Sequence, residues 1–138
     1  MSNPLASALG RVSVTTVLLV AASAAFGTAN VVHDKHTQAA TARMMTGGDP
    51  DRAPRIFRRY GCAGCHTIAG IPGADGQAAA PLTGLSKRVY IAGVLENRPD
   101  NLIAWIVSPQ RFSQQTAMPQ SGISEQEARD LAAYLYAQ

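Results

Sequence analysis

The sequence is poor in residues that build common metal sites and nucleic-acid surfaces. Its 138 residues include two cysteines and three histidines, and two of these histidines, His33 and His36, lie in a polar stretch far from the cysteines. A structural zinc site needs four ligands, usually two Cys/His pairs, so we do not expect one. Aromatic residues make up 6% of the chain and the net charge is +3. This modest excess, with no aromatic residues interleaved in a basic run, does not favour nucleic-acid binding.

Both cysteines lie in one five-residue motif, Cys62-Ala63-Gly64-Cys65-His66. The spacing Cys-x-x-Cys-His is typical of covalent c-type haem attachment, in which each thiol forms a thioether with a haem vinyl group. His66 would then bind the iron as one of its two axial ligands. A thioredoxin-like dithiol would follow a strand of a βαβ unit, and no such pattern precedes Cys62. A disulfide is the other alternative, although closing so short a loop gains little from chain entropy.

An uncharged apolar stretch runs from Val12 to Val32 near the start of the chain. At about 1.5 Å per helical residue it spans roughly 30 Å, the thickness of a bilayer core. We therefore expect residues 1–32 to be a membrane anchor that contacts lipid through residues 12–32, with its N-terminus in the cytoplasm because Arg11 precedes it. A signal peptide is the alternative, since Ala22-Ser23-Ala24 and Gly27-Thr28-Ala29 have cleavage-like spacing. Either segment sends the rest of the chain across the membrane.

Residues 33–51 are predicted to be a flexible linker and residues 52–138 the globular domain. The linker is polar, rich in Thr and Ala, and has no apolar period. As a flexible chain it would reach roughly 25 Å, so the domain would swing near the membrane. The alternative is that the segment extends the anchor helix or lies against a neighbouring subunit. So short a domain makes a marginal apolar core, and we expect it to depend on a bound haem for folding.

Three helices are expected in the globular domain, over residues 51–59, 99–107 and 124–137. The apolar face of the first consists of Ala53, Ile56, Phe57 and Tyr60. The third begins with a capping box formed by Ser124 and Glu127, and its apolar stripe is expected to pack on the first helix. Residues 67–97 are predicted to be mostly loop, with a short helix over 89–95 and no strand pair.

Met118 is the expected sixth ligand of the iron. It is the one methionine of the globular domain, in the run Thr116-Ala117-Met118-Pro119 between the second and third helices. Pro119 stiffens the local backbone, and no histidine follows His66. An imidazole and a thioether would fill both axial positions and leave no open position for a substrate. The alternative is that Met118 is an ordinary packing residue.

In combination, these features over Arg52–Gln138 resemble the monohaem class I cytochrome c family. The features are an N-terminal helix, the Cys-x-x-Cys-His motif, a proline-containing loop, a tryptophan helix, Met-Pro and a C-terminal helix. The runs 98–106 and 132–135 are similar to those of bacterial membrane-linked cytochromes and of cytochrome domains attached to haem-copper oxidases. The resemblance implies an all-α class I cytochrome c fold, with three to four helices around one covalent haem, preceded by one N-terminal transmembrane helix.

The resemblance also implies roles for residues outside the motif. The backbone carbonyl of Pro81 would accept a hydrogen bond from the second ring nitrogen of His66, which fixes the tautomer of the ring and raises its basicity. Arg88 and Trp105 are similar to residues that contact the haem propionates, and Tyr90 is expected to join them.

The implied activity is one-electron transfer by an electron carrier that is not itself an enzyme. We expect the haem domain on the periplasmic side of the inner membrane, relaying electrons from a quinol:cytochrome c oxidoreductase to a terminal haem-copper oxidase. One alternative is a fixed electron-entry subunit of a larger membrane enzyme, such as an oxidase, a nitric oxide reductase or a dehydrogenase. The other is a gas-binding or peroxidatic haem protein, which would need a labile sixth ligand.

Overall fold

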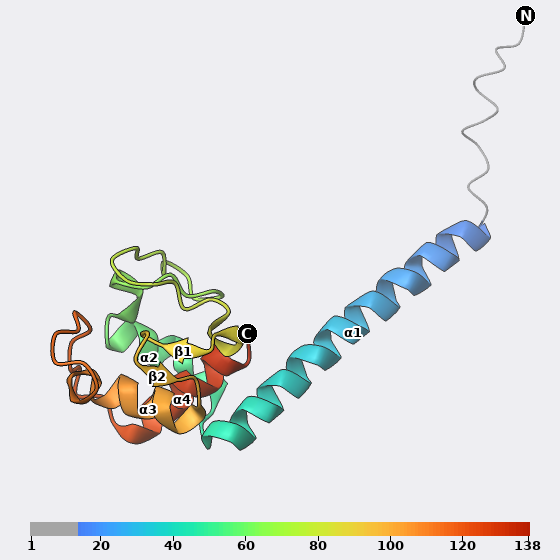
Figure 1. Cartoon of the computed structure of the whole chain (residues 1–138). Helices are drawn as coiled ribbons and strands as arrows, with labels where there is room; N and C mark the ends of the chain where they lie inside the picture. Colours follow the sequence, from blue (N-terminus) through green and yellow to red (C-terminus); the bar gives the residue numbers. More distant parts are fainter. Residues whose placement is uncertain (1–13) are drawn as a thin grey trace, which may run out of the picture. The chain divides into compact units, whose positions relative to one another are not determined.

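A computed structural model describes residues 14–138 of the chain (Figure 1). Its helices are α1 (Val14–Thr46), α2 (Ala53–Arg59), α3 (Pro99–Val107) and α4 (Glu125–Tyr136). Four 3-10 turns lie between them: η1 (Pro50–Arg52), η2 (Cys62–Gly64), η3 (Leu85–Lys87) and η4 (Pro109–Arg111). Two short strands, β1 (Tyr90–Ile91) and β2 (Leu95–Glu96), form an antiparallel pair. The chain divides into two compact units, residues 1–35 and 36–138.

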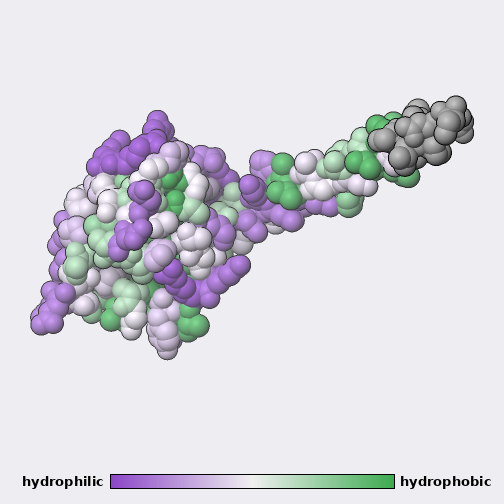
Figure 2. Space-filling view, turned by 90° about the horizontal axis from the view of Figure 1, so that it is seen from above, coloured by the Kyte–Doolittle hydropathy of each residue, from purple (hydrophilic) through white to green (hydrophobic). Residues whose placement is uncertain are grey.

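Helix α1 is long and apolar enough to cross a membrane, judged by length and composition. The side chains of Leu18, Leu19 and Val20 are 63–68% exposed, and hydrophobic residues are visible along the helix in Figure 2. A signal sequence near an N-terminus would have the same properties. Arg11, on which the expected orientation rests, lies outside the described residues, so anchor and orientation stay predictions.

The segment expected to be a flexible linker is helical over most of its length. Helix α1 continues through residues 33–46 and ends at Thr46, so the structure follows the alternative in which this segment extends the preceding helix. The physical reason is local. Residues 33–46 contain no glycine or proline, and the alanine and methionine residues among them are good helix formers. A polar composition is expected both for an exposed helix and for a flexible chain, so composition alone does not distinguish the two.

The junction that follows α1 is bound to α4. The guanidinium of Arg129 donates to the Thr46 carbonyl at 2.9 Å, and the Asp49 N–H donates to the Asp130 carboxylate at 2.7 Å. Asp130 is 2% exposed, so this hydrogen bond satisfies a buried acceptor. The compact unit that contains the globular part thus begins at His36, upstream of the predicted start at Arg52.

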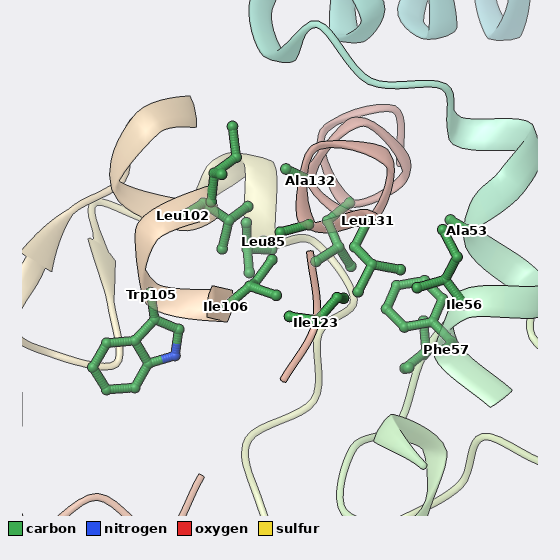
Figure 3. Close-up of a cluster of buried hydrophobic side chains, with 14 of the residues drawn as sticks. Ala53, Ile56, Phe57, Leu85, Leu102, Trp105, Ile106, Ile123, Leu131 and Ala132 are labelled. Atoms are coloured by element: carbon green, nitrogen blue, oxygen red, sulfur yellow. The ribbon is translucent and has the colours of Figure 1, made fainter. Parts of the chain in front are cut away.

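The apolar core lies where α4 packs against α2 and α3 (Figure 3). Phe57 of α2 meets Tyr134 of α4 edge to face, with ring centroids 5.5 Å apart and an interplanar angle of 75°. The expected packing of the third helix on the first is therefore confirmed. The capping box is confirmed as well, because Ser124 and Glu127 each bond the other's backbone N–H.

Residues 89–95 do not form the expected helix, and a strand pair is present where none was expected. Tyr90 pairs with Glu96 and Ile91 with Leu95. Between the strands, Ala92 and Gly93 have φ values of 50° and 74°, and the Val94 N–H donates to the Ile91 carbonyl at 3.0 Å. Two central residues with positive φ define the tight turn whose twist suits a hairpin, and glycine adopts this conformation without strain.

Candidate functional site

The Cys-x-x-Cys-His motif forms a tight turn just after α2. Gly61, in a left-handed conformation, ends the helical segment and leads into η2. The backbone N–H groups of Cys65 and His66 then both donate to the Cys62 carbonyl, at 3.2 and 3.0 Å. The two thiols and the imidazole therefore belong to a single turn of backbone, as attachment of one planar group through both sulfurs requires.

The two cysteines of this turn are free thiols. The structure therefore does not adopt the disulfide alternative. Cys62 is half-buried and packs against the apolar core, whereas Cys65 is exposed. Burial raises the pKa of the Cys62 thiol above its usual range, because the core disfavours the charged thiolate. One sulfur thus faces the apolar cluster and the other faces solvent.

The ring of His66 is oriented by a backbone carbonyl. Its Nδ1 lies 2.7 Å from the carbonyl oxygen of Ala80. With hydrogen on Nδ1 the ring donates to this oxygen, and Nε2 keeps its lone pair for a metal ion. The acceptor is one residue earlier than expected, since the Pro81 carbonyl accepts from the Arg88 guanidinium. The assignment of Pro81 as the acceptor for His66 is corrected to Ala80.

The register of the loop explains this shift by one residue. The Ala79 N–H donates to the Cys65 carbonyl at 2.9 Å, and the Leu82 N–H donates to the Thr67 carbonyl at 2.8 Å. These two bonds hold the loop beside the motif, so that the Ala80 carbonyl faces the imidazole. Sequence spacing alone does not reveal which residue of such a loop faces the ring.

Gly76 allows the loop to approach the motif closely. Its N–H donates to the Ala63 carbonyl at 3.2 Å, and its carbonyl accepts from the Thr67 hydroxyl at 3.0 Å. A Cβ atom on Gly76 would lie 2.6 Å from the Ala63 oxygen and from backbone atoms of Gly64. No side chain fits there without moving the backbone of the motif.

Met118 contacts the apolar cluster that Cys62 also contacts. Its loop is fixed by Gln110 of η4, whose side-chain amide donates to the Met118 carbonyl at 2.7 Å. The Met118 N–H donates to the Thr116 hydroxyl at 3.3 Å. The cluster thus receives a cysteine from the motif and a methionine from a loop about fifty residues later in sequence. The role of Gln110 had no signal in the sequence.

The three residues expected at the propionates lie in different environments. Arg88 is half-buried and donates to the Pro81 carbonyl and, at 3.3 Å, to the Thr83 carbonyl. Trp105 is buried on α3, and Figure 3 shows its indole at the edge of the core cluster. Tyr90 is 57% exposed on β1. A role for these residues in contacting propionates stays a prediction.

The side chain of Asn97 makes three hydrogen bonds that the sequence did not predict. Its side-chain amide donates to the Leu85 carbonyl at 2.7 Å and to the Arg88 carbonyl at 2.8 Å. Its amide oxygen accepts from the Tyr136 hydroxyl at 2.7 Å, and burial raises the pKa of Tyr136 to about 12. The end of α4 therefore supports the loop that carries Arg88.

The donor set fits a covalently attached haem. The turn after α2 supplies two free thiols and an imidazole whose Nε2 is available to a metal ion. A thioether and an apolar cluster lie on other segments of the same unit. Among the described residues there is no cluster of three or more His, Cys, Asp or Glu side chains that would favour a different metal centre.

Comparison with known proteins agrees with this donor set. Residues 50–137 match the family described as Cytochrome c. The chain is 41% identical over 83 residues to cytochrome c oxidase subunit 2 of Alkalihalophilus pseudofirmus. That match covers 59% of this chain and 23% of the relative, so the chain aligns with less than a quarter of the relative's length. No solved structure matches the chain. The resemblance to class I cytochromes c, including those associated with oxidases, is thereby confirmed, and the chain belongs to the cytochrome c family.

Proposed function

We propose that this chain is a membrane-anchored monohaem cytochrome c that relays single electrons to a haem-copper oxidase. Membership of the cytochrome c family makes it a haem-dependent electron carrier. The observation that carries the finer proposal is the turn of Cys62, Cys65 and His66, with the imidazole held through Nδ1 by Ala80. The remaining residue roles follow from that turn.

The chain's own residues would hold the haem in a fixed geometry. Cys62 and Cys65 would form the two thioethers, and His66 would bind the iron through Nε2. The hydrogen bond from Nδ1 to Ala80 fixes the ring and increases its basicity. A bound c-type haem supplies reversible one-electron exchange between ferric and ferrous iron.

Met118 is the proposed second axial ligand. It contacts the cluster against which Cys62 also packs, and Gln110 fixes its backbone. With His66 and Met118 both holding the iron, dioxygen and peroxide would not bind, so the chain would transfer electrons without catalysing a reaction. Thioether ligation and an apolar surrounding both raise the reduction potential, since they disfavour the more charged ferric state.

The place in a respiratory chain is inferred from the relative and from α1. The relative is an oxidase subunit, which supports a haem-copper oxidase as the acceptor, and we propose a quinol:cytochrome c oxidoreductase as the donor. The exposed apolar part of α1 supports an anchor within residues 1–32. We further propose that this anchor crosses the inner membrane and places the haem domain on the periplasmic side.

A second candidate is a fixed electron-entry subunit of a larger membrane enzyme. One observation favours it over a free carrier. The relative is a subunit of an oxidase.

Spectra and co-purification test both candidates. The detergent-solubilised full chain should show a reduced spectrum that carbon monoxide leaves unchanged, because His66 and Met118 would both hold the iron. A spectrum altered by carbon monoxide would reject the electron-carrier proposal in favour of a gas-binding or peroxidatic protein. Isolation of an oxidase in constant ratio with the chain would favour the fixed subunit, and isolation of the chain alone would favour the free carrier.

A further inference from the structure

We propose that Arg88 is a positioning residue for His66, acting through the turn that carries the Ala80 carbonyl. This inference rests on the proposed function, because it concerns how the protein tunes His66 as an iron ligand. The sequence resemblance assigned Arg88 to the haem propionates, where it would act through its charge. The contacts of Arg88 indicate that it acts through hydrogen-bond geometry.

The guanidinium of Arg88 bridges two carbonyls of one turn. A single nitrogen, Nη2, donates to the carbonyl of Pro81 and, at 3.3 Å, to that of Thr83. Pro81 follows Ala80 directly, and the Ala80 oxygen lies 2.7 Å from His66 Nδ1. His66 therefore contacts the Ala80 carbonyl, and Arg88 contacts the carbonyl of the next residue, Pro81.

Arg88 adds a side-chain contact to a peptide that the backbone also holds, because the Pro81 carbonyl and the Leu82 N–H belong to one planar unit. The bonds from Ala79 to Cys65 and from Leu82 to Thr67 fix the ends of the segment. Between them, Pro81 has no N–H and can make no backbone hydrogen bond as a donor. Because Ala80 and Pro81 are both exposed, water competes for their carbonyls. Holding the Pro81 carbonyl limits rotation of the backbone that presents the Ala80 carbonyl to the ring.

Arg88 is itself anchored to the core of the domain. Its carbonyl accepts from Asn97 at 2.8 Å, and Asn97 accepts from the Tyr136 hydroxyl at 2.7 Å. The Arg88 N–H donates to the Leu85 carbonyl at 3.0 Å. Hydrogen bonds thus connect Tyr136 of α4 to Asn97, Asn97 to Arg88, and Arg88 to the Pro81 carbonyl beside Ala80.

The two possible roles of Arg88 predict opposite changes in the reduction potential. A well-placed Ala80 carbonyl makes the imidazole more basic, which favours ferric iron. Loosening this carbonyl should therefore raise the potential. If Arg88 instead acts through its charge, removing that positive charge would favour ferric iron and lower the potential. Arg88→Lys separates the two effects, because lysine keeps the charge but replaces the planar guanidinium with a compact, flexible ammonium.

The test uses the full-length, haem-loaded chain in detergent, with Arg98→Lys as the matched control. The Arg98 side chain is 71% exposed and pairs with Glu96 at 2.7 Å, remote in its contacts from the 80–83 turn. The readouts are the hydrogen-exchange rate of the His66 Nδ1 proton by paramagnetic NMR, the reduction potential and the midpoint of chemical unfolding. Neither variant removes a charge.

For Arg88→Lys we expect roughly fivefold to tenfold faster exchange of the His66 Nδ1 proton, equivalent to loss of one typical hydrogen bond. The reduction potential of Arg88→Lys should rise. Arg98→Lys should leave the exchange rate and the reduction potential at the wild-type values. If Arg88→Lys changes neither the exchange rate of the His66 Nδ1 proton nor the reduction potential, the inference is overturned. The same holds if only the unfolding midpoint shifts. A wild-type chain without covalent haem would refute the proposed function and this inference with it.

Discussion

Tyr60, the residue that follows α2, donates its phenolic hydrogen to the carboxylate of Glu127 of α4 across 2.8 Å. Arg59 donates to the same carboxylate at 2.7 Å and Ser124 at 2.8 Å. These bonds, the one from Tyr60 first, hold the pKa of Glu127 below its ordinary value, and the same contact raises the pKa of Tyr60. The network joins the helix before the haem motif to the last helix of the domain.

This network makes stability depend on pH in two windows. Glu127 has a lowered pKa in the folded state, so its contribution is complete above its ordinary value of 4.5 and is lost as the pH falls through the lowered value. Tyr60 has a raised pKa, so its contribution is lost as the pH rises above 10.0. We expect Tyr60→Phe to flatten both windows in thermal unfolding of the holoprotein. Identical pH profiles for the variant and the wild type would contradict this account.

Met118→Ala should remove the weak far-red band of ferric thioether–iron ligation and lower the reduction potential, because the proposed ligand is lost. The reduced variant should also respond to carbon monoxide. Met44→Ala is the control, since Met44 is 80% exposed on α1, and it should behave as wild type. If the band and the potential survive in Met118→Ala, another residue is the sixth ligand.

Gly76→Ala should destabilise the domain by about 1–3 kcal/mol, the usual range for overpacking a close contact. The reason is that its Cβ would lie 2.6 Å from the backbone of Ala63 and Gly64. Gly64→Ala is the matched control within the motif, because a Cβ there meets nothing within 4 Å. Chemical unfolding measures both. Equal stability of the two variants would show that the loop does not approach the motif as closely as described.

Asp130→Ala should loosen the junction after α1. The buried carboxylate of Asp130 accepts the Asp49 N–H, and leaving that donor without a partner costs about 1–3 kcal/mol. We expect faster amide exchange at Asp49 and lower stability, with little change at α3. Asp75→Ala removes an exposed carboxylate and serves as the control. Wild-type exchange at Asp49 in Asp130→Ala would argue against the junction contact.

Local patterns in the sequence predicted helices α2, α3 and α4 well. The capping box of Ser124 and Glu127 was predicted because both partners lie within one turn of each other. The contact between Phe57 and Tyr134 followed from two apolar stripes of helical period. The bounds of α3 agree with the expected residues 99–107, since Pro99 begins the helix and Ser108-Pro109 ends it.

The sequence did not predict features that depend on register or on distant partners. The choice between Ala80 and Pro81 depends on where the loop bonds to Cys65 and Thr67, which no local pattern reveals. The hairpin over 90–96 requires a positive φ at Ala92, an uncommon conformation for a residue with a Cβ. The bond between Asn97 and Tyr136 joins side chains 39 residues apart. The helix in residues 33–46 was missed because its polar composition has no apolar period.

The central claim is that a haem is covalently bound through Cys62 and Cys65. The most direct measurement is the intact mass of the purified protein after acid–acetone treatment, made on the wild type and on Cys62→Ala/Cys65→Ala. We expect the wild type to keep its colour and the added mass of one haem, and the double variant to carry neither. A wild-type chain that loses all pigment to the acetone, or that never carried it, would contradict the account.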